Sequence, residues 1–229
     1  MYTGLMIGLI VVGTMLSGVA AWLLAVLRLG RLGGTLVAVA GVGIVALVYR
    51  LVVRPWHLRW GATDEESTRA MPGDDLLSGA RSATRAITIR ATPDQIWPWL
   101  VQLGYGRAGW YSYDWIDNDF HSSADRVLPE HQRLEVGDRI LMMPNMGFEV
   151  QAVDPPHSIV SLLEDGSTSW CLALYPLDDE RTRLVSRWRP RFERSLATFV
   201  MTLLVEPGTF VMEQKMLRAI RDRAESMRH

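Results

Sequence analysis

The sequence predicts an α+β domain that follows an apolar, helical N-terminal segment. Residues 4–27 contain no charged side chain, which is typical of a membrane-spanning helix. Short apolar-rich runs, separated by turn-forming residues, follow one another between residues 140 and 188. The chain then closes with apolar residues at helical spacing. Together these patterns indicate an antiparallel sheet packed against a long C-terminal helix.

The N-terminal segment is predicted to form a hairpin of two transmembrane helices within residues 1–60, at about 4–27 and 32–53. The first would be roughly 35 Å long, enough to cross the hydrocarbon core of a bilayer. Gly33, Gly34, Gly41 and Gly43 would let the two helices approach closely. A cleaved signal peptide is the alternative, but no Lys or Arg precedes the apolar run.

The distribution of arginines favours a cytoplasmic domain. Arg28 and Arg31 lie between the two predicted helices, whereas Arg50, Arg54 and Arg59 follow the second. The single Cys171 agrees with a reducing compartment. We therefore expect an integral protein of the cell membrane whose soluble domain is cytoplasmic.

Residues 61–81 mix acidic residues with Gly, Pro and Ser and are predicted to form a linker to a domain at 82–229. Residues 82–90 alternate as a strand does. Thr92 and Pro93 are typical of a helix start, and Gly104 ends that helix. Residues 110–118 are predicted to form a second helix, with Trp110, Tyr113, Asp114 and Asp117 on one side.

Five strands in meander order are predicted next, at residues 140–143, 148–153, 158–163, 169–175 and 183–188. The final helix is predicted to begin at Glu206-Pro207 and to continue to near Met227. Before it lies an arginine-rich stretch that precedes the apolar run 196–205. This run could lie in the membrane interface with the arginines on anionic headgroups, or be a buried helix after a salt-bridged strand.

The composition excludes several function classes. The 24 basic and 25 acidic residues give a net charge of −1, which argues against nucleic-acid binding. One cysteine permits neither an internal disulfide nor a cysteine-rich zinc site. The sequence contains no nucleophile-elbow, HExxH, phosphate-loop or dinucleotide motif. We expect no cofactor and no metal.

The order of strand, two helices, antiparallel strands and one long helix resembles the START-like, polyketide-cyclase-like SRPBCC superfamily. The resemblance covers about residues 82–228. It is carried by the strand leading into residues 91–100, by 109–115, by 136–138 and 182–184, and by the closing 212–217. It implies a helix-grip fold, with a cavity between sheet and helix that holds a hydrophobic small molecule or lipid. Members range from lipid carriers to cyclases and hydrolases, so no reaction is implied.

The resemblance places a set of large side chains where they would line this cavity: Trp97, Tyr113, Phe148, Trp170, Trp188, Met212 and Met216. Ordinary core packing is the alternative for the aromatic residues and methionines alike. If they line a cavity, the protein is a membrane-anchored protein that binds a lipid or another hydrophobic ligand.

Two other functions remain open. A cofactor-independent cyclase or hydrolase would use Asp114, Asp117 or His121 as acid or base, with Tyr111 or Tyr113 as proton donor. The spacing of Asp114, Asp117 and His121 could also suit three metal ligands, but a solvated helix end followed by a loop is the favoured explanation. A ligand-free scaffold that docks a partner protein is the last possibility, and the sequence does not identify such a partner.

Overall fold

The computed structural model describes the backbone of residues 2–191 and 196–227 and the side chains within them, except those of residues 2–17, 19, 20, 23 and 196–204. The chain divides into two compact units at Pro55. The first unit is helical: α1 (Tyr2–Val48) continues through the π-helical turn η1 (Tyr49–Val53) into α2 (Arg54–Leu58).

Helix α1 is broken at Gly30, whose φ of 73° and ψ of 174° are not helical. Close to this break, a Cβ on Gly34 would lie only 2.3 Å from the Val26 side chain, so only glycine fits there. Gly41 and Gly43 have open space around them among the described residues. The break lies where the sequence predicts the turn between two helices. Most side chains of the first predicted span, 4–27, are outside the described residues.

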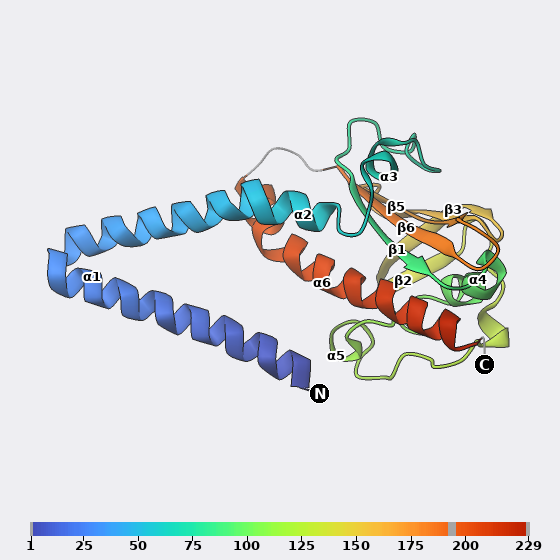
Figure 1. Ribbon diagram of the computed structural model, residues 1–229, viewed down its shortest axis with the longest axis horizontal. Helices are drawn as coiled ribbons and strands as arrows, with labels where there is room; N and C mark the ends of the chain where they lie inside the picture. Colours follow the sequence, from blue (N-terminus) through green and yellow to red (C-terminus); the bar gives the residue numbers. More distant parts are fainter. Residues whose placement is uncertain (1, 192–195, 228–229) are drawn as a thin grey trace. The chain divides into compact units, whose positions relative to one another are not determined.

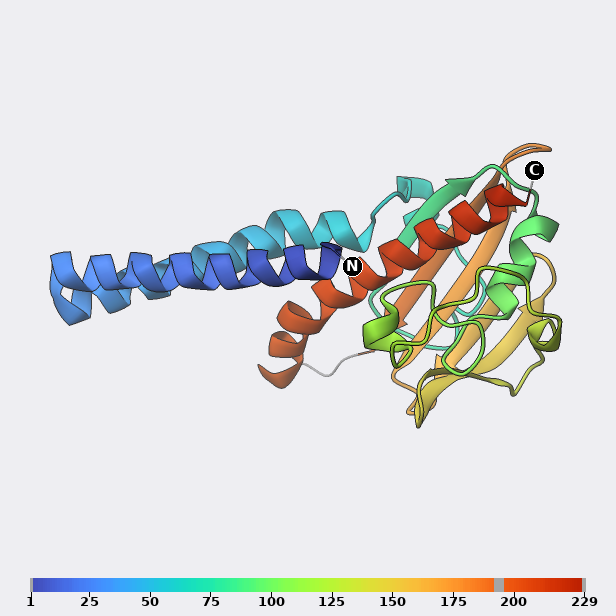
Figure 2. The same cartoon turned by 90° about the horizontal axis from the view of Figure 1, so that it is seen from below.

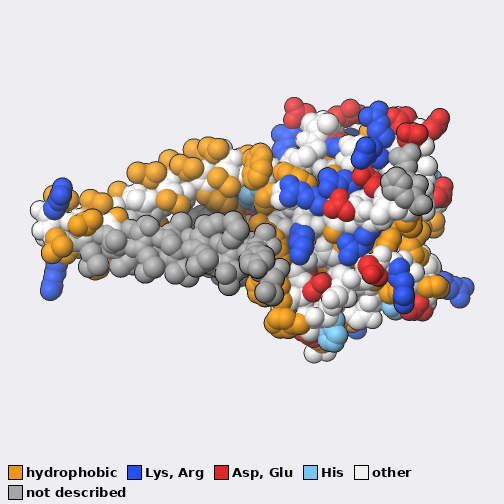
Figure 3. Space-filling model, turned by 60° about the horizontal axis from the view of Figure 1, so that its bottom comes forward, with side chains coloured by type: hydrophobic (Ala, Val, Ile, Leu, Met, Phe, Trp, Pro, Cys, Tyr) orange, Lys and Arg blue, Asp and Glu red, His pale blue; other side chains and the backbone are white. Residues whose placement is uncertain are grey.

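One helix of the described residues, Leu24–Leu58, is long and apolar enough to cross a membrane. Its mean hydropathy is 2.5, and none of its most apolar stretch is buried inside the protein. Figure 3 shows hydrophobic side chains along this helical part and charged side chains gathered on the second unit.

The second unit is an α+β domain built on one antiparallel sheet of six strands, in the order β1-β6-β5-β4-β3-β2. The strands are β1 (Ala83–Ile89), β2 (Arg139–Met143), β3 (Met146–Asp154), β4 (Ser158–Leu163), β5 (Thr168–Pro176) and β6 (Thr182–Pro190). The helices are α3 (Asp64–Thr68), α4 (Pro93–Val101), α5 (Asp114–Asp117), the 3-10 turn η2 (Pro129–His131) and α6 (Leu196–Ser226). The predicted strands and meander order are confirmed.

Helix α6 lies across one face of the sheet (Figures 1 and 2). Its apolar side chains Met216, Leu217, Ile220 and Ala224 belong to one core cluster with sheet residues such as Ile89, Leu172 and Leu184. A long C-terminal helix held against an antiparallel sheet is the helix-grip arrangement that the resemblance implies.

Two predicted helices differ from the structure. Helix α6 begins at Leu196 instead of Glu206, because the apolar run before Pro207 is itself helical and the proline is accommodated inside the helix. The helix predicted at 110–118 is reduced to four residues, Asp114–Asp117. Gly109 and Tyr111 have φ values of 77° and 54°, which interrupt a right-handed helix. Trp110 therefore points into the core and does not share a helical face with Asp114.

The residues predicted as a linker are part of the folded domain. Met71 is 5% exposed and packs with Val160, Cys171 and Val185 on the sheet face opposite α6. Helix α3 starts with a capping box, in which the Thr63 Oγ1 accepts from the Glu66 N–H at 3.1 Å and Glu66 Oε2 accepts from the Thr63 N–H at 2.8 Å. The segment thus covers the second face of the sheet.

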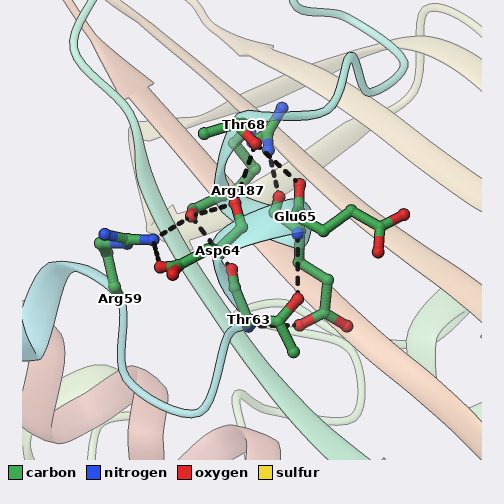
Figure 4. A network of polar contacts seen from close by, with 8 residues as sticks. Arg59, Thr63, Asp64, Glu65, Thr68 and Arg187 are labelled. Carbon is green, nitrogen blue, oxygen red and sulfur yellow. Dashed lines mark hydrogen bonds and ion pairs between the residues drawn. The ribbon is translucent and has the colours of Figure 1, made fainter.

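Arginines of strand β6 hold this segment in place. Arg183 donates to both carboxylate oxygens of Glu66, each at 2.7 Å. Arg187 is 3% exposed and donates to the Glu66 and Arg69 carbonyls and to Asp74. Figure 4 shows its guanidinium reaching the backbone of α3. Of the two possibilities for the arginine-rich stretch, this part is a salt-bridged strand; the side chains of residues 192–204 are outside the described residues.

Candidate functional site

An aromatic wall lines the inner face of the sheet, beneath α6. It consists of Trp110, Phe148, Trp170 and Trp188. Trp170 and Trp188 are stacked with ring centroids 5.1 Å apart, and Phe148 meets Trp188 edge-on at 5.3 Å. Trp110 joins the wall through Trp170, at 5.7 Å. Three of the predicted lining residues are thus brought together, and Trp110 is an addition.

The four rings differ in how deeply they are buried. Phe148 and Trp170 are 0% and 2% exposed, whereas Trp188 is only half-buried. The indole N–H of Trp170 donates to the Ser186 hydroxyl at 2.9 Å. The indole nitrogen of Trp188 is buried and has no hydrogen-bond acceptor within the part of the chain that the structure describes. A buried donor without an acceptor is costly, which marks Trp188 as a donor available to a ligand.

A charged network lies beside the aromatic wall. Arg85 of β1 forms an ion pair with Glu213 of α6, and their side chains are 3% and 5% exposed. Glu213 also accepts from the Ser186 hydroxyl at 2.5 Å, and Arg85 donates through Nε to the His57 carbonyl at 2.9 Å. Because Ser186 in turn accepts from Trp170, the network connects α2, the sheet, α6 and the aromatic wall. The residues of this network, Arg85, Ser186 and Glu213, were not among the predicted site residues.

The remaining predicted lining residues are not part of the aromatic wall. Met216 is 4% exposed and belongs to the core, and Trp97 packs against that core from α4 while partly exposed. Tyr113 and Met212 are also partly exposed. The Ser112 hydroxyl donates to the Met212 carbonyl at 3.1 Å, and the Lys215 ammonium lies 4.0 Å from the centre of the Tyr113 ring. The residues before α5, Ser112 and Tyr113, therefore contact α6 at Met212 and Lys215.

The carboxylates proposed for catalysis have different surroundings. Burial and the nearby Asp114 carboxylate raise the pKa of Asp117 from 3.8 to about 6, while the Ser112 hydroxyl and Lys215 oppose the rise. Asp114 accepts from the Ser123 hydroxyl at 2.5 Å, and this hydroxyl also accepts from the Tyr111 N–H at 3.0 Å. Asp114 therefore has a structural contact, whereas the raised pKa of Asp117 suits proton transfer near neutral pH.

The other acid–base candidates are placed elsewhere. His121 is exposed, with Nδ1 3.2 Å from the Asn118 carbonyl. Tyr111 is 2% exposed, its hydroxyl accepts from Gln102 at 2.7 Å, and burial raises its pKa to about 12. Tyr111 is thus a core residue that does not exchange a proton near neutral pH. No three His, Cys, Asp or Glu side chains gather as a metal site in the described ranges.

Replacing Asp117 by Asn is expected to stabilise the folded chain at pH 7.5 by about 1 kcal/mol, less than the full pKa shift implies because the side chain is only partly buried and its charge is partly screened by solvent. The folded-state pKa lies above 3.8, so the native carboxyl costs stability as the pH rises through about 4 to 6 and the cost is complete above that range. Urea unfolding of both chains at pH 4 and pH 7.5 tests this. An equal difference at the two pH values would contradict the assigned pKa.

No protein-family model matches the sequence, and no curated protein does. Solved structures with a similar fold do match. The Zhui aromatase/cyclase from Streptomyces sp. R1128 is 17% identical, with 65% of this chain and 96% of that chain covered at a TM-score of 0.42. The KanY protein is 12% identical, with 64% of this chain and 99% of that chain covered at a TM-score of 0.41. A polyketide-cyclase-like protein of Corynebacterium glutamicum is 19% identical, with 66% of this chain and 89% of that chain covered at a TM-score of 0.31. At these TM-scores the functional inference rests on the residues of this chain.

Proposed function

We propose that this protein binds a hydrophobic small molecule or lipid between the inner face of its sheet and α6, and that its N-terminal helices anchor it in a membrane. The observation that carries the proposal is the aromatic wall, in which the half-buried Trp188 ring is stacked on Trp170 and has a buried N–H that meets no acceptor among the described residues. Flat aromatic rings with one free donor suit a largely apolar ligand with a single polar acceptor.

The charged network supports the same proposal. A buried ion pair contributes little to stability compared with apolar side chains of the same size, so its presence in a core points to a role beyond packing. Arg85 and Glu213 join α6 to β1, and Glu213 also accepts from Ser186, which binds the indole N–H of Trp170 in the aromatic wall.

Anchoring in a membrane is supported by the helix Leu24–Leu58, which is apolar, exposed and longer than a bilayer requires. A tethered domain meets a membrane-dissolved ligand at a high local concentration. This favours a ligand that reaches the domain from the lipid phase.

Replacing Trp188 by Phe is the test of the ligand donor. An aromatic ring that can stack is retained, although it is smaller, while the indole N–H is lost. Titrating the detergent-solubilised full chain with the fluorescent fatty acid dansyl-undecanoic acid should give saturable binding, weakened about fivefold by Trp188→Phe because one hydrogen bond is lost.

The matched control is Trp97→Phe, an aromatic of α4 that contacts the core but does not belong to the aromatic wall. It should leave the affinity unchanged. Non-saturable partitioning of the probe into every variant alike would contradict the proposed binding site.

A cyclase or hydrolase is a second candidate because Asp117 combines burial with a pKa of about 6. If the bound ligand is converted, Asp117→Asn should abolish turnover and leave ligand retention intact, whereas His121→Ala should change neither. Analysis of the ligand extracted from the native chain and from both variants shows whether it has been converted to product.

A further inference from the structure

The loop that contains α5 exposes three large apolar side chains. Trp115, Ile116 and Phe120 are 54%, 51% and 80% exposed. They lie within six consecutive residues, which we call the α5 loop (115–120). Isolated exposed apolar residues are common on soluble domains, but a compact group of this kind marks a surface that contacts an apolar phase or partner.

The backbone holds these side chains outward. Asp119 and Phe120 have φ values of 47° and 63°, in the left-handed region that residues other than glycine rarely adopt. Hydrogen bonds hold this conformation: the Phe120 N–H donates to the Asp114 carbonyl at 2.9 Å, and the Tyr105 hydroxyl donates to Asp119 at 2.5 Å. The loop thus keeps an unfavourable backbone while the Phe120 ring stays in solvent.

Residues 210–215 of α6 contact both the end of the apolar helix and the residues before the α5 loop. Phe210 of α6 contacts Trp56 and Trp60, which end and follow that helix, at centroid distances of 5.4 and 6.3 Å. Less than two helical turns further along α6, the backbone of Met212 accepts from Ser112 and Lys215 lies over Tyr113, the two residues before α5. The same stretch of α6 therefore contacts the end of the helix and the start of the loop.

Given the membrane anchor proposed above, we infer that the α5 loop inserts Trp115, Ile116 and Phe120 into the interfacial region of the bilayer and so holds the domain on the membrane surface. Tryptophan beside large apolar residues is typical of segments that enter this region. The exposed cations Lys215 and Arg218 lie beside the same stretch of α6 and suit anionic headgroups.

Leu177 provides a matched control at the other end of the domain. It is 52% exposed, similar to Trp115 and Ile116. It lies in the turn between β5 and β6, next to Thr182, which pairs with Ile89 at the end of β1. The following Arg90 contacts Glu225 near the C-terminal end of α6, whereas the α5 loop contacts the stretch around Met212.

The native thiol does not interfere with labelling of introduced cysteines. Cys171 is 4% exposed, and burial raises its pKa to about 12, so it should not react with a maleimide in the folded chain. The variants Phe120→Cys, Ile116→Cys and Leu177→Cys are labelled with the fluorophore NBD and reconstituted as full chains in nanodiscs of phosphatidylcholine and phosphatidylglycerol. Nitroxide-labelled lipid then reports which positions touch the bilayer.

We expect NBD at positions 116 and 120 to be blue-shifted and quenched at least about threefold more strongly by the nitroxide lipid than NBD at position 177. Equal, water-like emission at positions 120 and 177 in a chain that resists extraction by alkaline carbonate would overturn the insertion and leave the anchor standing. Release of the chain by carbonate would overturn the anchor itself. A blue shift without nitroxide quenching would also overturn insertion, since it would place the loop against protein.

Discussion

Replacing Glu213 by Leu is expected to destabilise the full chain by about 3 kcal/mol or more, because the change leaves the Arg85 guanidinium buried without its counter-charge. Arg85 is 3% exposed and, among the described residues, would retain its bond to the His57 carbonyl and its contact with the Phe210 ring. The Ser186 hydroxyl would lose its acceptor as well. Urea unfolding of the detergent-solubilised chain, followed by near-ultraviolet circular dichroism, measures the difference.

Two controls separate the buried charge from a general sensitivity of α6. Glu225 lies on the same helix as Glu213 and pairs with Arg90, whose Nη2 is 3.6 Å from the Glu225 carboxylate and whose side chain is exposed. Glu225→Leu removes this pair. This change should cost less than about 1 kcal/mol. The double variant Arg85→Met with Glu213→Leu should recover most of the loss, because two apolar side chains replace the pair. A double variant as unstable as Glu213→Leu would contradict the assignment.

Replacing Arg187 by Met is expected to cost about 3 kcal/mol and to loosen residues 61–74, because this one side chain satisfies several buried acceptors at once. It donates to the carbonyls of Glu66 and Arg69, to Asp74 and to the Thr84 hydroxyl. Limited trypsin digestion should then cleave after Arg69, which the native packing protects. Urea unfolding measures the loss of stability in parallel.

Arg181→Met is the matched control for Arg187. Arg181 is a largely exposed arginine just before β6, and among the described residues its ion pair is with Asp178, three residues away. Its removal should change stability by less than about 0.5 kcal/mol and leave the trypsin pattern unchanged. Equal cleavage of both variants would mean that the segment is held by its apolar contacts, such as Met71, and not by Arg187.

The sheet could be predicted from the sequence because its signals are local. The strands between residues 139 and 190 are short runs rich in apolar residues, separated by turn residues such as Asp165-Gly166 and Asp178-Asp179. Thr92 and Pro93 likewise mark the start of α4, where the Thr92 N–H donates to the Gln95 side chain at 3.0 Å. These preferences do not depend on partners that are distant in the chain.

The charged network could not be predicted from local patterns, although the sequence contains one sign of it. Arg85 shares the strand face of Ile87 and Ile89, and Glu213 falls at helical spacing with Phe210, Leu217 and Ile220. A charge on each apolar face hints at a buried pair. That the two charges meet is decided by the position of α6 on β1, which no local pattern encodes.

The structure differs from the predicted linker at 61–81 and from the predicted helix at 110–118 for related reasons. Residues 61–81 look polar because their acidic side chains serve the arginines of β6, a complementarity across more than a hundred residues. The helix at 110–118 had suitable spacing, but the left-handed Tyr111 is stabilised by tertiary contacts with Gln102 and Ser123. Tertiary contacts override local preference at both places.

Native mass spectrometry, with lipid extraction, of the full chain released from host membranes tests whether the interior between the sheet and α6 holds a hydrophobic ligand. We expect one defined apolar mass bound to the native chain, and its loss from the Met212→Trp variant, in which a large ring on α6 competes for the interior. A folded native chain that carries no bound mass, or the same mixture of annular lipids on both chains, would contradict it.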